Sequence, residues 1–106
     1  MLAGAMNGCR VTSETEENGC WLYEVELGLE DGPLRVRARL AWEDYDLWVR
    51  DGSVEPARVA EAMVRWLSAP GRLDALPNRL DSSHPRRIES TADEQIVRLI
   101  RETPLD

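Results

Sequence analysis

An α+β fold is predicted by one long β-hairpin and by two amphipathic helices that follow it in the chain. Residues 21–42 contain two runs of alternating apolar residues, joined by the turn-forming Glu30-Asp31-Gly32-Pro33. Residues 54–68 and 92–101 repeat apolar residues at helical spacing. With a short strand ahead of the hairpin, the predicted architecture is a three-stranded antiparallel meander with two main helices packed on one face. We expect the 106 residues to form a single domain, in which residues 1–8 are loosely ordered.

The hairpin pattern predicts a pairing of Leu29 with Leu34 across a four-residue loop. In this register the apolar residues share one face and oppositely charged residues lie opposite each other on the other face. A shift of one residue would disrupt both the apolar face and the charged pairs. The further apolar pairs are Leu27 with Val36, Val25 with Ala38, Tyr23 with Leu40 and Trp21 with Trp42, and the charged pairs are Glu26 with Arg37 and Glu24 with Arg39.

Residues 9–15 predict an edge strand that pairs with the strand beginning at Trp21, and two registers compete for it. The second register uses Asn18-Gly19 as a two-residue turn, the strongest local hairpin signal, but it moves Val11 to the charged face. The first register keeps the apolar face continuous, so we predict it and expect Asn18-Gly19 to lie in a longer loop. Its pairs are Cys9 with Leu27, Val11 with Val25 and Ser13 with Tyr23.

Residues 43–50 fit a short helix and an irregular crossover equally well. Ser53 is the predicted N-cap of the 54–68 helix, and Pro56 lies in its first turn. This helix has one narrow polar stripe and a wide apolar arc. The stripe is Arg58, Glu61, Arg65 and Ser68, and the arc is Val59, Ala60, Ala62, Met63, Val64, Trp66 and Leu67.

Pro70-Gly71 ends the 54–68 helix, and the leucines of the connector that follows, at 73, 76 and 80, are expected to fill the core. A short helical turn is predicted over 84–88. Thr91 and Glu94 predict a capping box for the last helix, which continues through residue 101. The apolar face of that helix is Ala92, Ile96, Leu99 and Ile100.

Charge and composition narrow the range of partners. Twenty acidic residues against 13 basic ones give a net charge of -7, which disfavours nucleic-acid binding. No apolar stretch is long enough for a membrane span, and the first residues do not resemble a signal peptide, so we expect a cytoplasmic protein without membrane contact. Cys9 and Cys20 fall at opposite ends of a strand, too far apart for a disulfide, and are expected to be reduced.

The segment 81–87 is the most chemically suggestive in the chain. Its hydroxyl, imidazole and guanidinium groups near a helix start could hold a phosphate or carboxylate. The simpler interpretation, which we favour, makes Asp81 or Ser83 a helix cap and the arginines a response to the acidic excess, because no glycines are present to wrap a phosphate. The candidate anion-binding residues are Ser83, His84, Arg86 and Arg87.

Aromatic residues interleaved with Glu43, Asp44 and Asp46 predict a second candidate surface, which would bind a basic peptide or a divalent cation. The acidic residues match no defined calcium loop. We favour a crossover whose aromatics are core over partner binding, and place metal binding below both. The candidate partner-binding residues are Trp42, Tyr45, Trp48 and Trp66.

Catalysis has little support, because His84 is the only histidine and no nucleophile motif surrounds the serines or cysteines. We expect no metal and no cofactor. The leading hypothesis is a small acidic, non-enzymatic protein-interaction module. The alternative is a binder of, or enzyme acting on, a small anionic ligand. We also expect a homodimer through the wide apolar arc of the 54–68 helix, or second through the edge strand.

Overall fold

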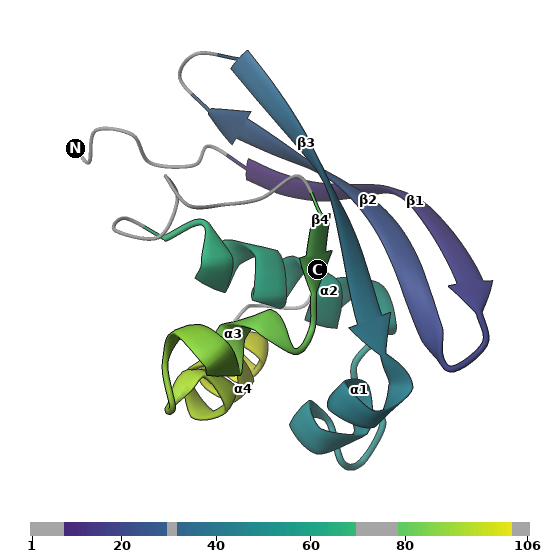
Figure 1. Ribbon diagram of the computed structural model, residues 1–106, viewed down its shortest axis with the longest axis vertical. Helices are drawn as coiled ribbons and strands as arrows, with labels where there is room; N and C mark the ends of the chain where they lie inside the picture. Colours follow the sequence, from purple (N-terminus) through teal and green to yellow (C-terminus); the bar gives the residue numbers. More distant parts are fainter. Residues whose placement is uncertain (1–7, 30–31, 70–78, 103–106) are drawn as a thin grey trace.

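The computed structural model describes residues 8–29, 32–69 and 79–102, which form one four-stranded sheet and four helices (Figure 1). In chain order the elements are β1 (Gly8–Glu17), β2 (Cys20–Leu29), β3 (Gly32–Ala41), α1 (Trp42–Trp48), α2 (Pro56–Leu67), β4 (Arg79–Asp81), α3 (His84–Ile88) and α4 (Ala92–Glu102). The strand order is β1-β2-β3-β4. The antiparallel meander β1–β3 confirms the predicted α+β fold, and β4 adds a short parallel strand beside β3.

The helices lie on one side of the sheet (Figure 1). Helix α2 packs on β1, β2 and β3, and α4 packs against α2, so these are the two main helices that the sequence predicts. The opposite face of the sheet carries no helix among the described residues. The core between sheet and helices includes Val25, Leu27, Val36, Ala38 and Leu40 from the sheet, Ala60, Met63, Val64 and Leu67 from α2, and Ala92, Ile96 and Ile100 from α4.

The predicted register of the hairpin is wrong by two residues. Leu34 lies opposite Leu27, not Leu29, and Leu29 lies opposite Gly32. A two-residue shift keeps every side chain on its predicted face, because side chains alternate with a period of two. The remaining observed pairs are Val25 with Val36, Tyr23 with Ala38, Trp21 with Leu40, Glu24 with Arg37 and Glu26 with Arg35.

A β-bulge between Val11 and Ser13 reconciles the two registers that compete for β1. Before the bulge, Val11 pairs with Val25 as predicted. After it, Ser13 lies opposite Glu24 rather than Tyr23, and the pairing runs on to the Asn18-Gly19 turn. The expected longer loop is therefore wrong. Gly19 has a φ of +77°, which a residue with a side chain rarely adopts, so glycine suits this turn.

Several local predictions at the helix ends need correction. Helix α2 begins at Pro56 with Glu55 before it, and Ser53 is not the cap; the Ser53 hydroxyl and N–H donate to the Asp51 carboxylate instead. The Ser68 side chain is not part of a polar stripe, because it is buried and donates to the Val64 carbonyl oxygen at 2.7 Å. The stretch after β3 is a short helix, α1, rather than an irregular crossover.

The last helices form where the sequence predicts them, with α3 over His84–Ile88 and α4 from Ala92. The described hydrogen bonds of the Thr91 hydroxyl run to the side chains of Glu89 and Gln95, not to a capping partner at Glu94. Leu80 is buried in β4, as expected. The predictions for Leu73 and Leu76 lie outside the described residues.

The apolar arc of α2 is covered within the single chain. Val59, Ala62 and Trp66 are all buried, and the Trp66 indole N–H donates to the Gln95 side chain of α4 at 2.8 Å. The gap that motivated a helix-face dimer is therefore absent from the part of the molecule that the structure describes. Both cysteines are unpaired, as predicted. No described helix is long and apolar enough to cross a membrane.

Candidate functional site

Arg86 is the centre of a polar network that joins three helices. Its guanidinium contacts the Asp44 carboxylate of α1 at 2.9 Å and the Asp93 carboxylate of α4 at 3.0 Å. Asp44, only 7% exposed, also accepts a 2.6 Å hydrogen bond from the buried Ser82 hydroxyl. Asp93 also accepts from the Trp48 indole N–H at 2.8 Å. Arg86 therefore links the three helices. Most of its N–H donors are already bonded to carboxylates, which leaves few of them for a ligand.

The other three residues of the predicted anion site do not belong to this network around Arg86. The Ser83 hydroxyl and N–H both donate to the Asp81 carboxylate, in a local turn before α3. The His84 ring accepts the Asp81 N–H at Nδ1, at 3.2 Å. Arg87 is exposed and contributes to no ion pair that the structure describes. The segment 81–87 thus does not converge on one point, and of these four residues only His84 lines a hollow.

The four aromatic residues predicted to bind a partner fall into a buried pair and a more exposed pair. Trp48 and Trp66 are buried in the core, each with its indole N–H bonded, so neither can meet a partner. Trp42 is 43% exposed and Tyr45 is half-buried. Both rings pack on Trp21 of β2, which the sequence analysis assigns only to the hairpin.

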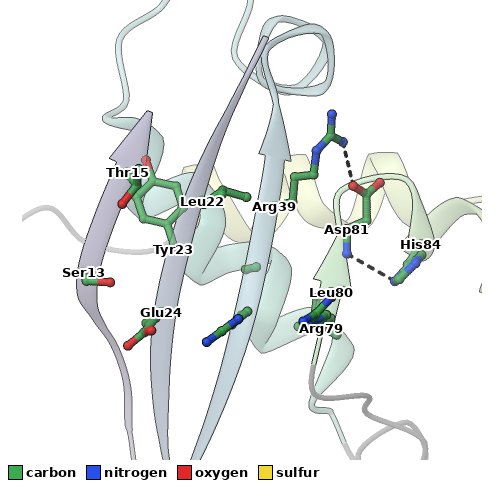
Figure 2. Close-up of a pocket in the computed structure, with 12 residues that line it drawn as sticks. Ser13, Thr15, Leu22, Tyr23, Glu24, Arg39, Arg79, Leu80, Asp81 and His84 are labelled. Carbon is green, nitrogen blue, oxygen red and sulfur yellow. Dashed lines mark hydrogen bonds and ion pairs between the residues drawn. The ribbon is translucent and has the colours of Figure 1, made fainter. Parts of the chain in front are cut away.

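A hollow of about 580 Å³ lies on the face of the sheet opposite the helices (Figure 2). All four strands contribute to its lining. Its main side chains are Thr15 of β1, Leu22 and Glu24 of β2, Arg37 and Arg39 of β3, and Arg79 and Asp81 of β4, with His84 beside them.

Two of the arginines in this hollow are neighbours, and neither forms an ion pair among the described residues. Arg37 and Arg79 are opposite each other in the β3–β4 pairing and both are exposed. Glu24 lies across from Arg37 on β2, yet the described residues give neither Arg37 nor Arg79 an ion pair within 4.0 Å. Like charges on adjacent strands repel, so this arrangement costs stability unless an anion lies between them.

Arg39 is held differently, by a 2.8 Å ion pair with Asp81 (Figure 2). That hydrogen bond raises the pKa of Arg39. Burial alone would raise the pKa of Asp81, but hydrogen bonds from Ser83 and Arg39 outweigh it and hold the pKa below its ordinary value. Both groups stay charged near neutral pH. The Arg39–Asp81 pair therefore carries no net charge, and the positive charge available to a ligand in the hollow comes from Arg37 and Arg79.

Sequence reasoning missed the arginines of the hollow. Arginines alternate with apolar residues along β3, but the sequence pattern predicts only cross-strand pairs of Arg37 with Glu26 and Arg39 with Glu24. The position of Arg79 depends on β4, a three-residue strand too short to give a pattern. Only the parallel pairing of β4 with β3 places Arg79 beside Arg37.

The described side chains form no group of three or more histidines, cysteines and acidic residues suited to a metal ion. Comparison of the chain with known protein families, curated proteins and solved structures finds no match.

Proposed function

We propose that the protein binds a small organic anion, with a carboxylate or phosphate group, in the hollow on the open face of its sheet. One observation carries the proposal: Arg37 and Arg79 are adjacent, exposed and without an ion pair among the described residues, in a protein of net charge -7. An anion between them would remove their mutual repulsion and accept charge-assisted hydrogen bonds from both.

The rest of the hollow suits such a ligand. Its volume of about 580 Å³ lies within the range usual for small-molecule sites, about 300–1,000 Å³. Leu22 offers an apolar contact, and the Ser13 and Thr15 hydroxyls line the β1 side. Because Nδ1 of His84 accepts the Asp81 N–H, the neutral ring carries its proton on Nε2, which leaves a second donor.

This proposal keeps the predicted ligand class but changes the residues. His84 is retained from the predicted set, whereas Ser83 and Arg86 are engaged by carboxylates and Arg87 does not line the hollow. Arg37 and Arg79 take the place of the two predicted arginines. The proposed activity is binding, and no catalytic role is assigned to any side chain.

A thermal-stability screen tests the proposal directly. Inorganic phosphate, citrate and nucleoside monophosphates would each be added at near-neutral pH and low salt. A ligand at 100 times its dissociation constant adds about 2.7 kcal/mol to the free energy of unfolding.

The double variant Arg37→Ala/Arg79→Ala should lose this gain in stability. The control Arg87→Ala/Arg98→Ala removes the same charge from exposed positions outside the hollow, and it should keep the gain. Equal loss in both variants would refute the site.

A protein partner is the second candidate function, favoured by the exposed indole of Trp42. A homodimer is proposed only through β1, which is the edge of the sheet in the observed strand order. We place either function in the cytoplasm, because two unpaired cysteines suit a reducing compartment.

A further inference from the structure

An aromatic ledge formed by Trp21, Trp42 and Tyr45 lies where β3 passes into α1. The rings of Trp21 and Trp42 are 6.1 Å apart at an angle of 54°, and those of Trp21 and Tyr45 are 5.5 Å apart at 70°. Trp42 keeps 43% of its surface exposed. The Tyr45 hydroxyl donates to the carbonyl oxygen of Val54, which ties the ledge to the start of α2. The indole face of Trp42 is thus presented to solvent by a pre-ordered cluster.

Carboxylates surround this ledge. Glu16 of β1 is the register partner of Trp21. Burial raises the pKa of Tyr45, and the negative charges of Asp46 and Asp51 raise it further. These charges create a negative potential at an exposed aromatic surface, which is the environment that a cation prefers.

The phenol of Tyr23 is a further polar group near this end of the sheet, two residues along β2 from Trp21. Tyr23 is 1% exposed, and its oxygen is buried without a hydrogen-bond partner. The ring extends from β2 toward β1 (Figure 2). Burial raises its pKa most, the Glu14 carboxylate raises it further, and Glu16 and Glu55 add smaller contributions in the same direction. A buried oxygen without a hydrogen-bond partner is unusual, because buried polar groups normally have partners.

We propose that the ledge is a docking surface for a lysine- or arginine-bearing segment of a partner protein. One cationic side chain of the segment would lie over the exposed Trp42 indole, and a neighbouring cation would reach the exposed carboxylates of Glu14 and Glu16 on β1. Charge complementarity selects this occupant, since the aromatic rings attract cations and every named charge around them is negative. The surface does not overlap the arginines of the open-face hollow, so it is independent of the proposed anion binding.

The test uses hexalysine, hexaarginine and hexaglutamate as probes, with binding followed through the indole N–H signals of ¹⁵N-labelled full-length protein. The basic peptides should shift the Trp21 and Trp42 signals and leave those of buried Trp48 and Trp66 unchanged. Trp42→Ala and the double variant Glu14→Gln/Glu16→Gln should each weaken binding by about threefold to tenfold. Hexaglutamate should not bind the ledge.

A matched control separates a site from general electrostatic attraction. Glu94→Gln/Glu102→Gln changes the net charge by the same amount on α4, and it should change the affinity by less than about twofold. Equal weakening in both double variants, or indole shifts spread over all four tryptophans, would overturn the proposal. Saturable shifts of the Trp42 signal on concentrating the protein without peptide at low salt, where pairing of two β1 edges is weakest, would also overturn it, by identifying a second copy as the occupant of the ledge.

Discussion

The position of Arg86 decides its role more than its residue type does. Between Asp44 and Asp93, its guanidinium is two-thirds buried and joins α1, α3 and α4. The hydrogen bonds that it donates to Asp93 and Asp44 raise its pKa, so it stays charged throughout the useful pH range. We expect Arg86→Met to lower the free energy of unfolding by about 1–3 kcal/mol, less than for a fully buried pair because water screens the site.

Urea unfolding at pH 7 measures this loss. Arg87→Met is the control, since Arg87 is exposed and should change the stability by less than about 0.5 kcal/mol. A stability of Arg86→Met equal to that of Arg87→Met would show that the network contributes nothing.

Asp93 also gives stability a dependence on acid. Burial raises its pKa, but the hydrogen bonds from Arg86 and Trp48 outweigh that effect and lower it. The folded state therefore binds fewer protons than the unfolded state, and the stabilisation is present above the ordinary pKa of 3.8 and lost as pH falls through the folded value. Wild type should lose stability between about pH 5 and pH 2, with Asp81 contributing in the same direction.

Denaturant unfolding curves, recorded at intervals of half a pH unit, would test this dependence of stability on pH. Arg86→Met should show a shallower decrease, because its Asp93 lacks the partner that lowers the pKa. A wild-type stability that is flat or rising toward acid would contradict the assignment.

Ala60 tests the core at a single position. It is fully buried on α2, against the sheet. Ala60→Asp should unfold the domain, because it places an unpaired carboxylate in the apolar interior. Circular dichroism of Ala60→Asp beside Arg98→Ala, an exposed α4 position, gives the comparison. A melting temperature unchanged from wild type would show that this face is not core.

At the scale of the element, the bulge in β1 lets two conflicting local preferences coexist. The Asn18-Gly19 turn sets the pairing near Glu17, while the apolar face requires Val11 opposite Val25. One extra residue, Thr12, absorbs the difference. Deleting Thr12 should destabilise the protein by about 1–3 kcal/mol, because either the turn or the inward placement of Cys9 and Val11 must be lost.

Cross-strand NMR contacts in the deletion variant would identify which preference is given up. Thr12→Ala keeps the chain length and loses only an exposed hydroxyl hydrogen bond to the Glu24 carbonyl, so it should stay close to wild type. A deletion variant as stable as Thr12→Ala would show that the bulge is not needed.

At the scale of the whole molecule, charge is distributed unevenly over the two sheet faces and the edge. Arginines gather on the open face, whereas Glu14, Glu16 and Glu17 follow the exposed end of β1. Pairing of two β1 edges across a two-fold axis would bring these glutamates together. Any dimer through β1 should therefore be weak and should strengthen with salt.

Sedimentation from micromolar to hundred-micromolar protein, at low and high salt, measures this association. The mass should rise with both concentration and salt. A constant single-chain mass under all these conditions would exclude the β1 dimer.

The sequence alone determined the fold class, the meander, the two faces of β2 and β3 and the apolar faces of α2 and α4. Each of these follows from side-chain periodicity, which acts over a few residues: alternation sends Tyr23 and Val25 inward, and helical spacing buries Ala60 and Met63. Even the wrong hairpin register kept every residue on its correct face, because apolar and charged patterns both repeat every two residues.

Tertiary structure alone decided what depends on residues far apart in the chain. Long-range contacts selected one of two hairpin registers that differ by two residues. They also buried Trp48 and Trp66 while Trp42 stayed exposed. They brought Arg86 together with Asp44 and Asp93, and they placed Arg79 beside Arg37 through a strand of three residues. Long-range contacts leave no periodic trace in the sequence, and both candidate binding surfaces are made of such contacts.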